Sequence, residues 1–188
     1  MGSAIHLETP RLIIRQFAPD DAALLVELDS DPAVMEYIGP STATVDAYRE
    51  RIETAYAGYY ARHRALGGWA MIERHSGRFL GWVCLRPAMD YRFANECGFE
   101  DQEAELGYRL RKDAWGKGYA TEASRAVMSR GWEQEPIAAV VAAAHIDNRR
   151  SRHVMEKCGL TLVKEFPLPG YDFLEVAYRL TRESAKSA

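Results

Sequence analysis

The chain has 188 residues, of which 47% are hydrophobic and 27% are charged, and its net charge at pH 7 is −3. This length and apolar content are typical of one folded domain, here residues 1–188, with a sizeable core. The slight acidic excess argues against direct binding of nucleic acid, which requires basic side chains for the phosphates. The longest apolar run, residues 137–144, is far shorter than the ~20 residues that span a bilayer, so no membrane partner is expected.

The cysteines and the start of the chain indicate the compartment. Cys84, Cys97 and Cys158 are odd in number and lack Cys-x-x-Cys spacing, so neither a disulfide framework nor a zinc knuckle is expected. The opening residues lack the basic and apolar regions of a secretory signal. His145 and His153 lack the spacing of a metalloprotease motif, and no metal is assigned to them. These features predict a cytoplasmic protein without a metal.

The first half of the chain predicts a strand, two helices and a hairpin. In chain order, these are a strand at 12–17, a helix that begins at 19–21, an amphipathic helix, and hairpin strands at 69–73 and 78–85. The apolar pattern of the amphipathic helix covers residues 45–59, and the helix is expected to end near residues 67–68. Apolar residues at helical spacing define the helices. Turn-forming residues at 75–77 separate the hairpin strands.

The second half alternates strands with helices. Residues 87–102 lack periodicity and are expected to form a loop. The elements that follow are a strand over 103–110, a glycine-containing turn into a helix, a buried strand at 137–144, a helix from 147 to 159, and strands at 160–166 and 173–180. This order predicts a mixed α/β fold, with a mixed central sheet of about seven strands flanked by about four helices.

The turn at residues 115–123, with the sequence WGKGYATEA, lies between a strand and a helix. Gly116 and Gly118 permit positive φ angles, and the first N–H groups of the following helix have no intrahelical partner, so this turn can hold a pyrophosphate. The alternative is a tight turn without a ligand. A P-loop and a dinucleotide fingerprint are excluded, because Gly118 is followed by Tyr and no third glycine completes the spacing.

The helix that begins near residue 148 places two polar residues on one face. Asn148 and Ser151 are one turn apart, so both side chains can face the same ligand. The alternative is that Asn148 only caps the helix and that Ser151 is an ordinary first-turn residue.

Taken together, these stretches resemble the GNAT superfamily of acyl-CoA-dependent N-acetyltransferases, and within it the RimJ/RimL-like branch. Residues 8–15, ETPRLIIR, are similar to the opening strand of that branch, and residues 105–110 to the strand before its cofactor loop. Residues 115–120 are similar to the cofactor loop of the family. That loop has Gln or Arg at its first position, followed by any two residues, Gly, any one residue, and then Gly or Ala. Trp115 departs from this pattern at the first position. Residues 148–160 resemble the family's Asn-x-x-Ser/Ala helix.

The resemblance implies acetyl-CoA as co-substrate, wedged into a sheet that is splayed between the strand ending near Leu110 and the strand at 137–144. A bulged strand end would offer N–H groups to the pantetheine, the glycine turn would bind the pyrophosphate, and Asn148 would hold the pantetheine arm. The implied cofactor-binding residues are Leu110, Gly116, Lys117, Gly118, Tyr119, Ala120, Thr121, Asn148 and Ser151. Trp115 is expected to alter packing rather than abolish binding.

The transfer also needs a proton donor for the leaving thiolate and a base for the amine. Many relatives carry a general-acid Tyr where this chain has Met155, which leaves Ser151 or water to protonate the leaving thiolate. The attacking amine is mostly protonated at pH 7 and needs a base. Glu105 is the candidate, and Glu103, two residues away on the same strand face, is the alternative. The competing interpretation of both is an ion pair within the sheet.

The expected acceptor is a primary amine. The α-amino group of a protein or peptide is favoured, because its pKa near ~8 requires less of a base than a Lys-type amine near ~10.4. A small-molecule amine such as a polyamine, amino acid or antibiotic is the alternative, as is a non-catalytic acyl-CoA-binding module. Specificity is expected from the first two helices, residues 87–102 and the turn at 167–171. The protein is expected to act as a monomer or homodimer.

Overall fold

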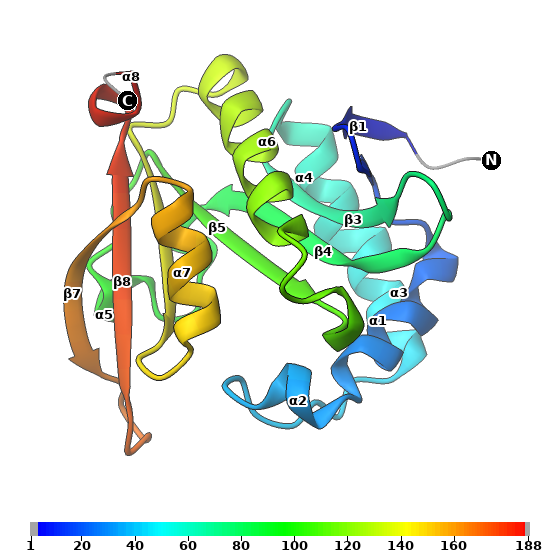
Figure 1. The fold of residues 1–188 in the computed structure, drawn as a ribbon, viewed down its shortest axis with the longest axis horizontal. Helices are drawn as coiled ribbons and strands as arrows, with labels where there is room; N and C mark the ends of the chain where they lie inside the picture. The colour runs from blue at the N-terminus through cyan, green and yellow to red at the C-terminus, as the bar shows by residue number, and fades with distance from the viewer. Residues whose placement is uncertain (1–3, 187–188) are drawn as a thin grey trace.

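The computed structural model describes residues 4–186, which form an eight-stranded sheet in the order β1-β2-β3-β4-β5-β6-β8-β7 (Figure 1). The strands are β1 (Ile5–Glu8), β2 (Leu12–Arg15), β3 (Gly67–Glu73), β4 (Phe79–Pro87), β5 (Glu103–Leu110), β6 (Ala139–His145), β7 (Thr161–Pro167) and β8 (Leu174–Thr181). Neighbouring strands are antiparallel except β5 and β6, which are parallel. The mixed sheet is therefore confirmed, with β1 as a strand that the sequence analysis missed.

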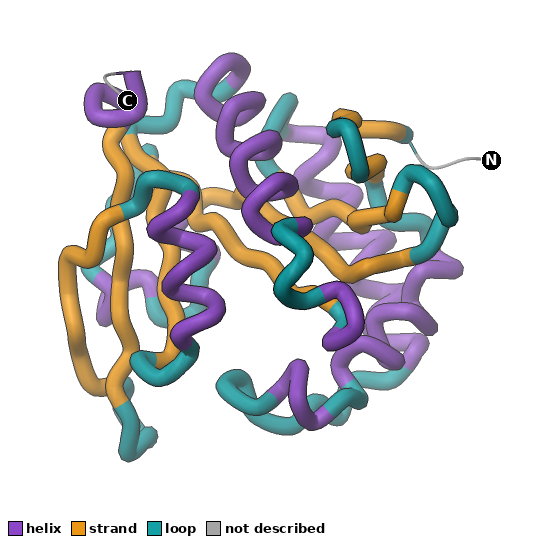
Figure 2. Tube along the Cα trace, in the orientation of Figure 1, coloured by secondary structure: helices purple, strands orange, loops and turns teal. Residues whose placement is uncertain are grey.

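The helices cover both faces of this sheet. They are α1 (Ala22–Asp29), α2 (Pro32–Met35), α3 (Val45–Arg51), α4 (Ala57–Arg62), α5 (Ala94–Cys97), α6 (Tyr119–Gln134), α7 (Arg149–Lys157) and α8 (Arg182–Lys186). Figure 2 shows α6 and α7 in front of the strands and α1, α3 and α4 behind them. The main helices were predicted, and the others are short turns of four or five residues.

The predicted helix over 45–59 is α3, a π-helical turn (Ile52–Tyr56) and α4, and it ends at Arg62. The expected end near Gly67 and Gly68 is wrong, because both glycines belong to β3. A Cβ on Gly68 would lie 2.6 Å from the Tyr56 ring. This glycine therefore lets the helix approach the sheet closely.

Residues 87–102 were expected to be a loop, but part of this segment is packed into the core. It contains a 3-10 turn (Ala88–Asp90) and α5. Its buried side chains pack behind β6, β7 and β8, and are Ala88, Ala94, Cys97 and Phe99. Turns this short show no helical periodicity in a sequence, because one turn is too few residues to repeat a pattern.

The sheet opens between β5 and β6. These strands pair only from Glu103 with Ala139 to Glu105 with Val141, after which they diverge. The predicted bulge near Leu110 is wrong, because the register of β5 with β4 is continuous. The N–H of Arg111 donates to Leu80 on the β4 side at 2.9 Å. Since N–H groups alternate between the two edges of a strand, those of Tyr108 and Leu110 point to the splayed edge, where β6 offers no acceptor.

Candidate functional site

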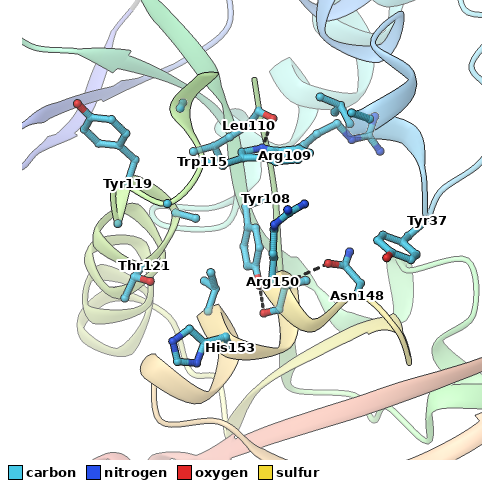
Figure 3. Close-up of a pocket in the computed structure, with 18 of the residues that line it drawn as sticks. Tyr37, Tyr108, Arg109, Leu110, Trp115, Tyr119, Thr121, Asn148, Arg150 and His153 are labelled. Atoms are coloured by element: carbon cyan, nitrogen blue, oxygen red, sulfur yellow. Dashed lines mark hydrogen bonds between the residues drawn. The ribbon is translucent and has the colours of Figure 1, made fainter. Parts of the chain in front are cut away.

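A cavity of about 310 Å³ lies at the splay, between β5, the turn before α6, α7 and the segment around α2 (Figure 3). Most of the predicted cofactor-binding residues line it, namely Leu110, Gly116, Gly118, Tyr119, Ala120, Thr121, Asn148 and Ser151. Lys117 lies between two of these glycines but does not line the cavity. Its carbonyl accepts a hydrogen bond of 2.8 Å from Arg11.

The turn before α6 has the geometry of an anion cradle. Gly116 and Gly118 have φ angles of +73° and +82°, in the left-handed region that favours glycine. The first helical bond runs from Glu122 N–H to the Gly118 carbonyl at 3.0 Å, so the three N–H groups before Glu122 have no intrahelical acceptor. Nothing lies within 4 Å of the position that a Cβ on Gly116 would take. The turn therefore fits a phosphate group.

A clamp from the turn between β1 and β2 fixes this cradle. Arg11 Nε donates to Glu122 Oε2 at 2.6 Å, and Thr9 Oγ1 donates to the other Glu122 oxygen at 2.6 Å. Arg11 also holds the Lys117 carbonyl, so one guanidinium joins the loop to the first turn of α6. The sequence analysis missed this contact, because 111 residues separate Arg11 from Glu122.

Trp115, which departs from the family pattern, closes one wall of the cavity. Its indole N–H donates to the Leu110 carbonyl at 2.8 Å. The Arg150 guanidinium lies 5.0 Å from the indole ring. The side chain therefore links the end of β5 to α7 and leaves the backbone of the glycine turn open.

Asn148 and Ser151 are brought together with a residue that the sequence analysis missed, Tyr108. The Asn148 Oδ1 caps α7 by accepting the Ser151 N–H at 3.1 Å, which leaves the Asn148 amide NH₂ as a donor (Figure 3). The Tyr108 hydroxyl donates to the Ser151 carbonyl at 2.8 Å and lies 3.0 Å from Ser151 Oγ. The Ser151 hydroxyl can therefore donate to the Tyr108 oxygen.

Burial raises the pKa of Tyr108 above its ordinary value, so this hydroxyl stays protonated. Its position follows from strand alternation, which places it with Leu106 and Leu110 on the face covered by α6 and α7. Met155 is 1% exposed and belongs to the core. The cavity thus has a tyrosine hydroxyl, supplied by β5 rather than by α7.

Neither Glu105 nor Glu103 lines the cavity. Glu105 is buried, and its Oε2 accepts from Arg86 Nε at 2.8 Å. Glu103 pairs with Arg179 at 3.0 Å. Both face away from Tyr108 on β5, because they are an odd number of residues from it. Their contacts are those of ion-paired residues within the sheet, the competing interpretation given above.

Two features are absent from residues 4–186. No three His, Cys, Asp or Glu side chains there are grouped so as to hold a metal ion. No helix in the same range has the length and apolarity needed to cross a membrane.

The family is established by comparison with known proteins. Residues 11–161 match the acetyltransferase (GNAT) domain, so the chain belongs to the GNAT acetyltransferases and uses acetyl-CoA. It is 30% identical over 183 residues to the FsC-acetyl coenzyme A-N(2)-transacetylase of Aspergillus fumigatus, which covers 94% of this chain and 76% of the relative. It is 26% identical over 152 residues to the putative ribosomal N-acetyltransferase YdaF of Bacillus subtilis, covering 79% and 76% of the two chains.

Solved structures show the same fold. A GNAT acetyltransferase from Bacillus anthracis superposes with a TM-score of 0.74 at 23% identity, covering 94% of this chain and 98% of the other. RimL, a ribosomal L7/L12 alpha-N-protein acetyltransferase in complex with coenzyme A, gives a TM-score of 0.73 at 15% identity, covering 96% and 99%. The chain is therefore an acetyl-CoA-dependent N-acetyltransferase with a mixed α/β fold.

Proposed function

We propose that this enzyme transfers the acetyl group of acetyl-CoA directly to the α-amino group of a protein or peptide, as a member of the RimJ/RimL-like branch. The observation that carries the proposal is the cavity at the splay, with unpaired N–H groups of β5 on one wall and the glycine cradle of α6 on another. These two sets of donors match the two ends of an acyl-pantetheine diphosphate.

In this proposal each end of the co-substrate meets a distinct set of donors. The pyrophosphate lies on the turn of residues 116–121, where free N–H groups and the positive end of α6 favour anions. The pantetheine amides lie against the N–H groups of Tyr108 and Leu110 and against the Asn148 amide. A backbone N–H directed at the thioester carbonyl stabilises the charge that develops on its oxygen during attack.

Direct transfer is supported by the state of the cysteines. Cys84, Cys97 and Cys158 are free and buried. Burial raises the pKa of Cys84 and Cys97 to about 12 and that of Cys158 to about 11. Since the thiolate is the nucleophile, none of them is suited to carry the acetyl group. Free thiols also fit a reducing cytoplasm, the location that we propose.

The contact between Ser151 and Tyr108 supports a proton donor for the leaving thiolate. Either hydroxyl can pass a proton to the sulfur and be reprotonated through the other. The benefit is small, because a thiol has a pKa of ~8.5 and its thiolate already leaves readily.

A small-molecule amine is the second candidate acceptor. The observation that favours it is the 30% identity to a relative whose name describes it as an FsC-acetyl coenzyme A-N(2)-transacetylase. The preference for an α-amino group rests on its lower pKa, near ~8, which leaves more of the amine unprotonated at neutral pH.

Two measurements test the proposal. Saturating acetyl-CoA should raise the Tm, whereas ATP and NAD should not, because only a ligand of the native state stabilises it by mass action. Free CoA should then be released in the presence of peptides with a free N-terminus. A rise in Tm without release of CoA for any peptide or small amine would indicate a non-catalytic acyl-CoA-binding module.

A further inference from the structure

One buried carboxyl group has no partner. Five acidic side chains are buried within the described residues, namely Asp21, Asp29, Glu103, Glu105 and Glu175. The first four each form an ion pair with an arginine. Glu175 is 7% exposed, and its carboxyl forms no hydrogen bond or ion pair within the range 4–186, although its backbone pairs with β6 and β7. A buried carboxyl without a partner destabilises the fold, and such groups are concentrated at functional sites.

Glu175 does not itself line the cavity, but lies near the splayed end of the sheet, on the face opposite α6 and α7. Unlike Glu105 and Glu103, it has no arginine paired with its carboxyl in the part of the chain that the structure describes. It is directly opposite His145 of β6, so both side chains are on the same sheet face. His145 is the last residue of β6, beyond the point at which β6 separates from β5. The His145 Nδ1 accepts the Asp147 N–H at 3.0 Å, so the neutral imidazole carries its hydrogen on Nε2.

A series of rings, which we call the aromatic string, connects the cavity with the strand that carries Glu175. Tyr37 lines the cavity (Figure 3), and its ring centroid lies 5.0 Å from that of His145. Phe173 lies 4.4 Å beyond His145, and Tyr171 lies 5.1 Å beyond Phe173. Tyr171 is 44% exposed. Aromatic faces attract cations, so the string is a suitable surface for an ammonium group.

We propose that Glu175 is the general base for the acceptor amine, and that the amine approaches it along the aromatic string. This inference rests on the proposed function. A Glu175 oxygen takes one proton from the acceptor ammonium, directly or through a water molecule, and the freed lone pair forms the C–N bond at the acetyl carbonyl carbon. The C–S bond breaks with its electron pair on sulfur. The sulfur then takes the second amine proton by way of Ser151 or water, and Glu175 returns its proton to solvent.

The surroundings of Glu175 suit a base that works near neutral pH. Burial raises the pKa of Glu175 to about 7, and the positive charge of Arg92 opposes this rise. His145 of β6 lies directly opposite Glu175. The charge of Glu175 acts on Tyr91 and Cys97, which also feel the charge of Glu105, and Cys97 feels those of Glu96 and Lys164 as well. A base is most effective when its pKa is near the working pH.

The experiment compares Glu175→Gln with the wild-type enzyme. The probes are Ala-Phe-Ala amide, tyramine and spermidine, and kcat is measured from pH 6 to pH 10 by release of free CoA. The wild-type profile should rise through an apparent pKa near 7. Glu175→Gln should lower kcat at pH 7 by about 10²- to 10⁴-fold, and the loss should shrink at pH 10, where the amine deprotonates unaided. The acetyl-CoA-induced rise in Tm should be unchanged.

The matched control is Glu165→Gln, an exposed carboxyl on the neighbouring strand β7, which should keep the wild-type profile. A Glu175→Gln enzyme with the wild-type rate and profile, or with the same loss at every pH, would overturn the assignment. The assignment would also be overturned if Glu105→Gln, rather than Glu175→Gln, abolished the rise of kcat near pH 7. If the wild-type enzyme releases no CoA with any probe, the proposed function is wrong, and the assignment of Glu175 as its general base is wrong as well.

Discussion

Replacing Gly118 with Val tests the anion cradle. Gly118 has a φ of +82°, and a β-branched residue in this left-handed conformation is strained by ~1–3 kcal/mol. A Cβ there would also lie 3.4 Å from Arg11 Nη2, in the clamp that holds the loop. The strain is relieved when the loop shifts, and this displaces the N–H groups that begin α6.

The expected loss of affinity follows from these donors. A hydrogen bond to a charged group contributes ~1.5–3 kcal/mol, so losing one raises the Kd for acetyl-CoA by about 10- to 100-fold. Titration calorimetry measures this Kd. The control is Gly77→Val in the turn between β3 and β4, where φ is +70° and nothing lies within 4 Å of a Cβ. Both variants should lose stability, but only Gly118→Val should lose affinity. Equal Kd values for the two variants would refute the cradle.

Three further predictions concern the site and the buried carboxyls. Ser151→Ala should keep the acetyl-CoA Kd within a few-fold and lower kcat by about tenfold or less. A large rise in Kd would instead make Ser151 a ligand of the co-substrate. Glu105→Gln should lower the free energy of unfolding in urea by up to about 3 kcal/mol, because Arg86 loses its carboxylate; an unchanged value would show the pair to be energetically neutral. Between pH 4.5 and pH 7 the free energy of unfolding should fall by about 1–2 kcal/mol more in the wild-type protein than in Glu175→Gln. The native carboxyl keeps its proton to a higher pH than the unfolded chain, and solvent screening keeps the effect below the full value of the shift.

Local chemistry made much of the fold predictable. The alternation of residues 103–110 predicted β5 with its observed bounds, and the glycines at 116 and 118 predicted the turn into α6. The helix from residue 147 was predicted to begin with a capping side chain, and the cap given as the alternative interpretation of Asn148 is observed. Each of these features depends on residues that are neighbours in the sequence, so a short window contains the whole signal.

The remaining site features depend on contacts between distant elements. Tyr108 meets Ser151 across 43 residues, and Glu175 meets His145 only through the register of β8 with β6. The splay results from the end of pairing at Glu105, which no local pattern specifies. The arginine partners of Glu103 and Glu105 likewise come from other strands. A strand sequence shows which residues share a face, but not what lies opposite them.

The most direct test of the account follows the acetyl group itself. The purified enzyme is incubated with isotopically labelled acetyl-CoA and a cell extract, and mass spectrometry locates the label. Label should appear on α-amino groups of proteins or peptides, and no label should appear when the enzyme is omitted. Label confined to lysine side chains or to a small amine would contradict the choice of acceptor, and label on no amine at all would contradict the account as a whole.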